Sequence, residues 1–307
     1  MKGWVATTDF GWYRFLKGRE ELDEVDFWQP SGHLAFHAVP PGAPFFFKLK
    51  RPHNAICGFG FLARSSQLPD WLAWDAFGEK NGAPDYPTMR RRIEKYIDPA
   101  RRTAHGSYTI GCLMVCEPVF FERDDWVAQP RDWARNIVRG KRYDLRSGEG
   151  RRIWEECRER ARRKAAPQLM FEGADRFGEP RLVRPRMGQG TFRIAVTDAY
   201  QGACAVTAEH SLPVLEAAHI QPYAEGGGHR IDNGILLRSD VHALFDKGYV
   251  TITKEHRFEV GRHLREEWHN GRTYYELHGR RIQLPEDAAE RPAPDLLAWH
   301  NESVFLG

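Results

Sequence analysis

The chain has 307 residues, of which 41% are hydrophobic and 12% aromatic, a composition typical of a globular protein with room for two domains. No apolar run approaches the roughly 18 residues that a membrane span needs, and we expect no secretory signal at the N-terminus. The net charge of +3 excludes no class of partner, because the local concentration of charge matters more than the total.

The cysteines indicate a reducing compartment. There are five of them, an odd number spread through the chain, and Cys112 and Cys116 are too far apart for a CxxC motif. This pattern favours the cytoplasm and argues against both a disulfide framework and a four-cysteine zinc site.

Residues 1–128 are expected to form strands separated by turns. The apolar or alternating runs are "GWVATT", "HLAFHAV", "APFFFKLK", "AICGFGFLA" and "YTIGCLMVCEPVFF". Between them, residues 68–83 and 86–97 carry helical spacing. Several strands with few helices predict a compact barrel or a strongly curved sheet.

A charged helix and a connector are expected next. Residues 149–165 form the helix, and residues 166–190 are rich in Pro, Gly and Arg. Residues 131–164 hold 13 Arg or Lys against 6 Asp or Glu. This run is either a solvated helix face with internal Glu–Arg pairs or a phosphate-binding surface, and the sequence leaves both open.

The second half contains the most informative stretch, residues 215–246, with the predicted order strand, loop, strand, helix. His242 and Asp246 are four residues apart, so they share a helix face and form a competent pair of metal ligands. His219 ends a strand and can accept a proton from water near neutral pH. Asn233 lies in the loop, where its side chain can hold the backbone.

This stretch resembles the HNH nuclease family with its ββα-metal motif, through "AHI", "DNGILL" and "HALFD" within residues 204–248. The resemblance implies that His219 is the general base and that Asn233 shapes the loop. It also implies that His242 is a ligand of Mg, Mn, Ni or Zn. Many relatives carry paired CxxC motifs for a structural zinc, but this region has only Cys204, so no structural zinc is expected.

One position departs from the family pattern. Many members carry a metal ligand directly before the base, where this chain has Ala218. Glu216 is expected to substitute if the strand bulges, or Asp246 to complete the site. The remaining histidines of this half, among them His210 and His229, are interpreted as structural.

The first half resembles the PUA-like superfamily, which includes the EVE, ASCH, YTH and SRA domains, through "PGAPFFFKLKRPHNAICGFGFLA". In the EVE and SRA members a modified base is flipped out and stacked between aromatic side chains. The pocket candidates are Trp12, Tyr13 and Trp28, with Asp9 for the base edge. The alternative is that these aromatic residues are core, as aromatic residues usually are.

The sequence therefore predicts an α+β protein with three parts. Residues 1–148 are a PUA-like curved β-barrel that reads a modified base, residues 149–190 a basic helix and linker, and residues 191–307 an HNH nuclease domain. The expected partner is double-stranded DNA carrying modified, cytosine-derived bases, and the expected cofactor is a divalent metal. No membrane partner is expected. A homodimer is one route to double-strand cleavage.

Two alternatives remain open at this stage. In the first, the nuclease is retained, but the N-terminal domain binds unmodified nucleic acid or a protein partner. In the second, the chain is a non-catalytic nucleic-acid-binding protein, and Ala218 is the feature in its favour.

Overall fold

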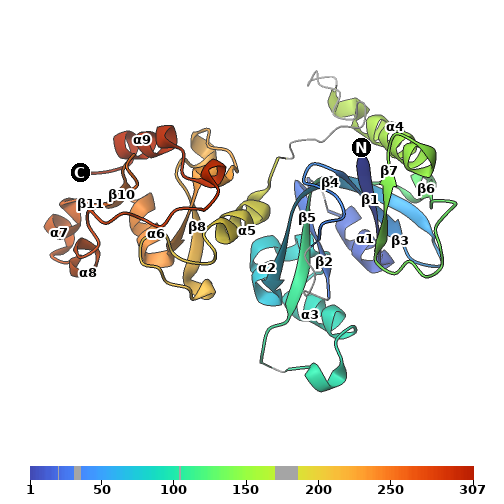
Figure 1. Cartoon of the computed structure of the whole chain (residues 1–307), viewed down its shortest axis with the longest axis horizontal. Helices are drawn as coiled ribbons and strands as arrows, with labels where there is room; N and C mark the ends of the chain where they lie inside the picture. Colours follow the sequence, from blue (N-terminus) through green and yellow to red (C-terminus); the bar gives the residue numbers. More distant parts are fainter. Residues whose placement is uncertain (20, 31–35, 104, 170–185) are drawn as a thin grey trace. The chain divides into compact units, whose positions relative to one another are not determined.

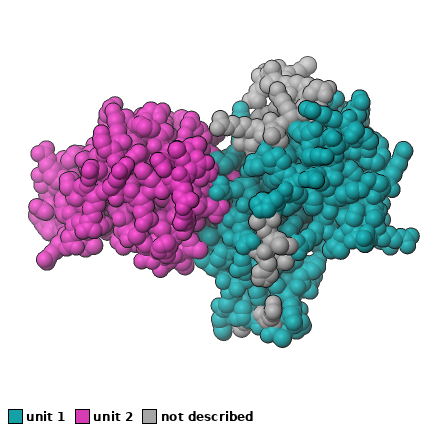
Figure 2. All heavy atoms as spheres, in the orientation of Figure 1, with its two compact units in different colours: residues 1–188 teal, residues 189–307 magenta. Residues whose placement is uncertain are grey.

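The computed structural model describes residues 1–19, 21–30, 36–103, 105–169 and 186–307 (Figure 1). The chain divides into two compact units, residues 1–188 and residues 189–307 (Figure 2). Each unit has hydrophobic clusters of its own and combines strands with separate helices. The predicted α+β class is therefore confirmed.

The first unit is built on a seven-stranded mixed sheet. Its strands are β1 (Lys2–Thr8), β2 (Glu24–Gln29), β3 (Pro44–Leu49), β4 (Ala55–Pro69), β5 (Thr109–Phe120), β6 (Val127–Ala128) and β7 (Gly140–Asp144). The order is β2-β5-β4-β3-β1-β7, with β6 paired to β4. Only β1 and β3 run parallel, and the other neighbours are antiparallel.

The apolar run of β3 is buried on both faces of the sheet. Phe45 and Phe47 belong to one hydrophobic cluster and Phe46 to another, as the alternation of a strand requires. The pairing of the long strands β4 and β5 shifts register twice, between Phe59 and Phe61 and between Leu62 and Arg64. Such β-bulges bend the paired strands. The curvature that the sequence predicts therefore arises at these bulges.

Helices cover the two faces of this sheet. They are α1 (Phe10–Lys17), α2 (Asp70–Phe77), α3 (Tyr86–Glu94) and α4 (Gly148–Leu169). Helix α1 buries Trp12, Tyr13 and Leu16 in the cluster that contains Phe45, whereas α4 buries Ile153 and Trp154 in the cluster of Phe46. No helix among the described residues is long and apolar enough to cross a membrane.

The strand predictions for this unit are partly wrong. Residues 36–39 are not a strand, and the rest of "HLAFHAV" lies outside the described residues. Strands β2 and β7 were not predicted, and β4 continues to Pro69, well beyond the apolar run that predicted it. Residues 170–185, most of the predicted connector, also lie outside the described residues.

The basic helix α4 belongs to the first unit, where it packs on the sheet rather than standing apart as a linker. Much of its charge is paired along the helix. Arg152 contacts Glu149 at 2.8 Å and Glu156 at 2.9 Å, and Arg160 contacts Glu156 at 3.3 Å. These ion pairs favour the solvated, internally paired helix face over the phosphate-binding surface.

The second unit contains two small hairpins and five helices among its described residues. The strands are β8 (Leu215–His219), β9 (Gly234–Arg238), β10 (Val250–Ile252) and β11 (Phe258–Val260). The helices are α5 (Gln189–Ala199), α6 (Ser239–Asp246), α7 (His263–Trp268), α8 (Arg272–Tyr275) and α9 (Pro294–Ser303). Strand β8 pairs with β9 and β10 with β11, both antiparallel.

The predicted order strand, loop, strand, helix is observed as β8, residues 220–233, β9 and α6. Helix α5 was not predicted, although Phe192 and Val196 on it pack against this hairpin. Residues 203–208, a short apolar run whose composition is compatible with a strand, form a turn instead. The turn is held by Cys204, a buried free thiol whose Sγ accepts from the backbone N–H groups of Thr207 and Arg238.

Candidate functional site

Asn233 closes the loop between β8 and β9. Its side chain is 1% exposed, its Oδ1 accepts from Gln221 N at 2.9 Å, and its Nδ2 donates to Gln221 O at 2.9 Å and Gly228 O at 3.0 Å. A Cβ at Gly227 would lie 1.9 Å from Gln221 O, so the loop backbone approaches too closely there for any other residue. One buried amide thus fixes the path of the chain after His219.

His219 lies at the end of β8, half-buried against an aromatic ring. Its imidazole stacks on Phe192 with a centroid distance of 3.9 Å and an interplanar angle of 13°. Burial, followed by the charges of His229 and His242, lowers the pKa of His219 from 6.5 to about 4. The imidazole is therefore neutral at physiological pH and has a lone pair available for a proton.

His229 is a residue of this site that the sequence interpretation missed. Its Nδ1 lies 3.0 Å from Nε2 of His219, and its ring stacks on Tyr223 with a centroid distance of 5.1 Å. The loop that Asn233 closes brings the two histidines together from positions ten residues apart. A histidine in a glycine-rich loop gives no spacing signal of its own, so its role emerges only from the fold.

His242 on α6 lies between two carboxylates. Its Nδ1 is 2.6 Å from Glu216 Oε2 on β8, and its Nε2 is 3.3 Å from Asp246 Oδ2, one helical turn away. Burial lowers the pKa of His242, but hydrogen bonds and charges from Asp246 and Glu216 outweigh burial and raise that pKa above its usual value. The structure thus brings all three proposed metal ligands together.

The structure corrects how Glu216 reaches this cluster. Strand β8 pairs with β9 in continuous register from Leu215 to His219, so no bulge is needed. Ala218, at the position where relatives often have a ligand, is fully buried in the core. The position of Ala218 therefore supplies no ligand, and the two carboxylates that contact His242 come from Glu216 and Asp246.

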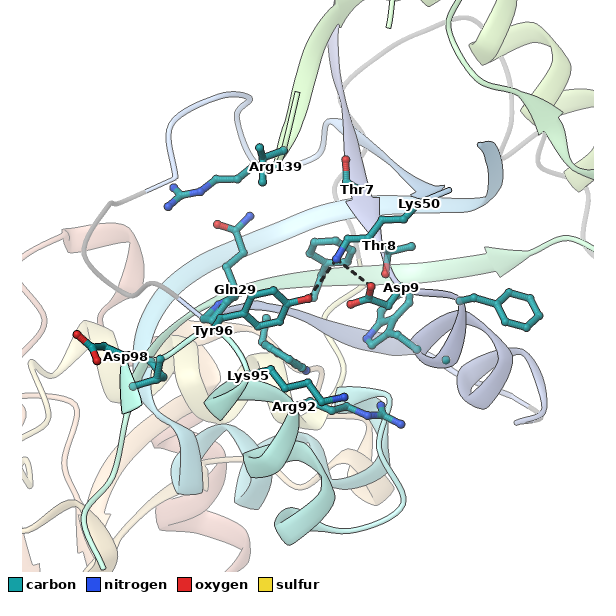
Figure 3. Close-up of a pocket in the computed structure, with 18 residues that line it drawn as sticks. Thr7, Thr8, Asp9, Gln29, Lys50, Arg92, Lys95, Tyr96, Asp98 and Arg139 are labelled. Carbon is teal, nitrogen blue, oxygen red and sulfur yellow. Dashed lines mark hydrogen bonds and ion pairs between the residues drawn. The ribbon is translucent and has the colours of Figure 1, made fainter. Parts of the chain in front are cut away.

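The first unit contains a pocket of about 800 Å³. Three of the four predicted base-binding residues line it, namely Asp9, Trp12 and Trp28. Lys50 contacts Asp9 Oδ1 at 2.8 Å and donates to the Tyr96 hydroxyl at 3.2 Å, as the dashed lines in Figure 3 show. Asp9 therefore enters the pocket as one member of a polar chain.

The aromatic predictions are corrected in part. Tyr13 does not line the pocket, because it is buried in the core and its hydroxyl donates to Phe121 O at 2.6 Å. Trp12 is 6% exposed and packs edge-on against Phe27, so it forms a floor rather than a free stacking face. Trp28 is half-buried, with its indole N–H donating to Asn81 O at 3.1 Å.

Cationic side chains on the pocket wall were not predicted. Arg92, Lys95 and Arg139 line the pocket together with Lys50, and Asp9 and Asp98 are the two acids in its lining (Figure 3). These four cations come from three separate parts of the chain, which the fold brings to one place. The pocket therefore has a positive balance that suits an anionic ligand such as a nucleotide.

Comparison with known families decides the nature of the second site. The HNH endonuclease family model matches residues 204–253, which include His219, α6 and the loop that Asn233 closes. Residues 204–253 form an HNH endonuclease domain. The chain thus carries a nuclease domain, and the predicted HNH endonuclease is confirmed.

Solved structures similar to the chain include an ASCH protein and a restriction endonuclease. An ASCH protein of Zymomonas mobilis is 14% identical and covers 49% of this chain and 94% of its own, with a TM-score of 0.32. A mutant of that protein is 10% identical, covering 50% and 94%, with a TM-score of 0.33. The modification-dependent restriction endonuclease TagI is 10% identical, covering 98% and 81%, with a TM-score of 0.31. No curated protein matches the chain.

The donor set of the HNH domain suits a divalent metal in its chemistry. An imidazole and two carboxylates, those of His242, Glu216 and Asp246, are ligands that such ions accept. Within the described part of the chain, no three His, Cys, Asp or Glu side chains surround a common point. Here each carboxylate contacts a nitrogen of His242 instead. For all three side chains to bind one metal ion, the two carboxylates have to turn away from these nitrogens.

A buried histidine supports α6 from behind and predicts a pH dependence of stability. His300 Nε2 donates to Phe245 O at 3.1 Å, its Nδ1 lies 2.8 Å from the Thr251 hydroxyl, and burial lowers its pKa from 6.5 to about 4. As the pH falls below 6.5, the unfolded chain binds the proton first, so stability decreases. Between pH 7 and pH 5 we expect a loss of about 2 kcal/mol from this group.

Urea unfolding of the second unit at pH 7 and pH 5 measures this effect. The pKa of His219 is also lowered, so His219 contributes to the same loss of stability. The effect of His300 is therefore the difference between the wild-type protein and His300→Gln, whose glutamine has no titratable group. An equal loss of stability in both proteins would show that His300 does not carry the effect.

Proposed function

We propose that this chain is a modification-dependent DNA endonuclease. In this proposal the HNH domain hydrolyses a phosphodiester bond and the pocket of the first unit holds a modified base flipped out of the duplex. The observation that carries the nuclease part is the neutral, stacked His219 beside a cluster of metal-type ligands, within the segment that matches the HNH family.

His219 is the general base in this mechanism. A neutral imidazole has one N–H and one lone pair, and the contact between Nε2 of His219 and Nδ1 of His229 engages one of them. If Nε2–H of His219 donates to Nδ1 of His229, the lone pair on Nδ1 of His219 accepts the proton of water. The water oxygen then attacks the phosphorus, the bond from phosphorus to the 3′ oxygen breaks, and this oxygen takes up a proton from solvent.

His242, Asp246 and Glu216 are the residues that would hold the metal. When bound, a divalent ion neutralises charge on the phosphate and stabilises the leaving oxygen. Asn233 positions the chain around these groups by fixing the loop that follows His219. Since the leaving group is the 3′ oxygen, the products carry 5′-phosphate and 3′-hydroxyl ends.

The end chemistry and metal dependence test the nuclease part. Supercoiled plasmid is incubated with Mg, Mn, Ni or Zn, and the nicked product is offered to DNA ligase without a kinase. We expect a nicked product that EDTA prevents and that ligase reseals. Ends that require a kinase before ligation would contradict the proposed leaving group.

His229 gives a prediction for turnover. Removing its Nδ1 acceptor leaves the tautomer of His219 unassigned, so His229→Ala should lower the cleavage rate roughly a hundredfold, at the lower end of the usual range for general base catalysis. Single-turnover cleavage at saturating enzyme measures the chemical step, and DNA affinity should change little. A variant with weaker DNA binding but an unchanged rate would indicate a substrate contact instead.

The base-reading part is supported by the pocket itself. It combines an aromatic floor, a hydrogen-bonding chain through Asp9 and Lys50, and a cationic wall, which are the parts that a flipped nucleotide needs. Flipping a base costs a few kcal/mol, which stacking and hydrogen bonds to the base edge offset. The modified base is proposed to be a cytosine derivative, and the DNA is proposed to be cut in the cytoplasm.

One HNH site cuts one strand, so we propose that double-strand cleavage takes two copies of the chain, as a homodimer or in successive events. Two results would favour other functions. Equal cleavage of modified and unmodified DNA would favour a first unit that binds unmodified nucleic acid or a protein partner. Failure to bind Mn or Ni would favour a non-catalytic protein, for which the buried Ala218 is the supporting observation.

A further inference from the structure

The pocket of the first unit is large for the task of recognising a methyl group. Its volume of about 800 Å³ lies in the upper part of the range for drug-sized ligands. Parts of its wall are open to solvent, since Tyr96 is 55% exposed and Val138 is 79% exposed. A pyrimidine with one added methyl group would leave most of this space to water.

A pocket of this kind discriminates methyl groups poorly. Even in a closed apolar pocket, one methyl or methylene group contributes only about 1–3 kcal/mol of discrimination between two ligands. A site that hydrogen-bonds a polar substituent rejects analogues lacking that substituent by roughly 10⁴-fold or more, because its own polar groups would be left unpaired. The physical design of the pocket therefore indicates which feature of the base it can recognise.

The hydrogen-bonding groups of the pocket are those that bind sugars. Asp9 presents a carboxylate, Gln29 an amide, Lys50 an ammonium group and Tyr96 a hydroxyl, and all four are among the labelled residues of the close-up (Figure 3). Carboxylate and amide oxygens accept from the neighbouring hydroxyls of a hexose, while ammonium and amide N–H groups donate to them. The half-buried indole of Trp28 supplies an apolar wall for a flat ring.

The side chains of Asp9, Lys50 and Tyr96 can replace the hydrogen bonds they make to one another with hydrogen bonds to such a ligand. Lys50 holds Asp9 at 2.8 Å and Tyr96 at 3.2 Å, and its side chain is 43% exposed. Burial lowers the pKa of Lys50, but its contacts with Asp9 and Tyr96 outweigh burial and raise that pKa, so the ammonium stays charged. The ammonium group of Lys50 is therefore available at neutral pH to orient hydroxyl groups.

We propose that the pocket binds a pyrimidine carrying a glycosyl substituent, with the base against Trp28 and the sugar hydroxyls on Asp9, Gln29 and Lys50. This inference rests on the proposed function and names the substrate class of its reading site. The cations Arg92, Lys95 and Arg139 then face the phosphates on either side of the flipped nucleotide. The size of the pocket, its polar lining and its cationic wall each match one part of this ligand.

Equilibrium binding to four duplexes tests the proposal. The full-length His219→Ala protein in EDTA, at one fixed salt concentration, is titrated against labelled duplexes that differ in one cytosine. This base is unmodified, 5-methylated, 5-hydroxymethylated or glucosylated at the hydroxymethyl group. We expect the glucosylated duplex to bind at least roughly a hundredfold more tightly than the methylated one.

Variants locate the effect in the pocket. Asp9→Asn and Gln29→Ala should each weaken binding of the glucosylated duplex about tenfold, since one hydrogen bond to the sugar is lost, and should affect binding of the unmodified duplex much less. Asp75→Asn removes an exposed carboxylate on α2 outside the pocket lining and is the matched control. It should bind all four duplexes as the parent protein does.

The possible failures are distinguishable. If the methylated and glucosylated duplexes bind equally, and both more tightly than unmodified DNA, the glycosyl inference is wrong and the proposed reader of modified bases stands. If all four duplexes bind alike, that reader is wrong as well. If Asp9→Asn and Gln29→Ala weaken every duplex equally, the pocket contacts the DNA backbone and the glycosyl inference is overturned.

Discussion

His219→Ala is expected to reduce DNA cleavage by roughly 10²–10⁴-fold, the usual contribution of a general base. The imidazole that we propose as the acceptor of the proton from water is lost, while the cluster around His242 remains. The half-buried ring of His219 stacks on Phe192, so the variant leaves a small gap at the surface rather than a hole in the core. Single-turnover cleavage of a labelled duplex at saturating metal measures the effect on the chemical step.

The matched control is His210→Ala, which removes an exposed histidine from the same domain. It should cleave at the wild-type rate. Circular dichroism and thermal melting of both variants establish that the fold is retained. If His219→Ala retained full activity while folded, the assignment of the general base would be wrong.

Asn233→Ala is expected to cost about 3 kcal/mol of local stability and to abolish cleavage. The amide makes three hydrogen bonds with the backbone of Gln221 and Gly228, and it is 1% exposed. Its removal leaves buried backbone groups without partners, which costs about 1–3 kcal/mol for each such group. The loop then no longer holds His229 against His219.

Hydrogen exchange measures this effect where it arises. The Gln221 N–H donates to Asn233 Oδ1, so its exchange should accelerate by about two orders of magnitude in Asn233→Ala. Asn233→Asp keeps the acceptor and loses the amide donors. Its Gln221 exchange rate should therefore lie between the rates of the wild-type protein and of Asn233→Ala. Asn270→Ala, at an exposed position, should change nothing. Unchanged exchange of the Gln221 N–H in Asn233→Ala would contradict the conclusion that the Asn233 side chain holds this loop closed.

The grouping of the proposed nuclease residues could be predicted largely from the sequence because these residues are local in the chain. His219, Asn233 and His242 lie within one hairpin and its following helix, so their order and spacing constrain the geometry. Asp246 follows from helical periodicity. Glu216 was named for the wrong reason, since it reaches His242 without the expected bulge. His229 depends on the path of a closed loop, which sequence spacing does not encode.

The first unit could be predicted only in outline. Apolar runs located β3 and β5, but the mixed strand order depends on pairings between distant segments. Tyr13 was placed in the pocket because it sits among turn residues, whereas α1 puts it on the core face one turn before Leu16. The cations at Lys50 and Arg139 are far apart in the chain and converge only in the folded structure.

Cleavage of matched plasmids tests the central claim most directly. The same plasmid is prepared with unmodified cytosine and with methylated, hydroxymethylated or glucosylated cytosine, and each is incubated with wild-type protein and Mn or Mg. The account predicts that only modified DNA is cut and that His219→Ala cuts none of the four. Cleavage of unmodified DNA at the same rate, or no cleavage of any substrate with any metal, would contradict it.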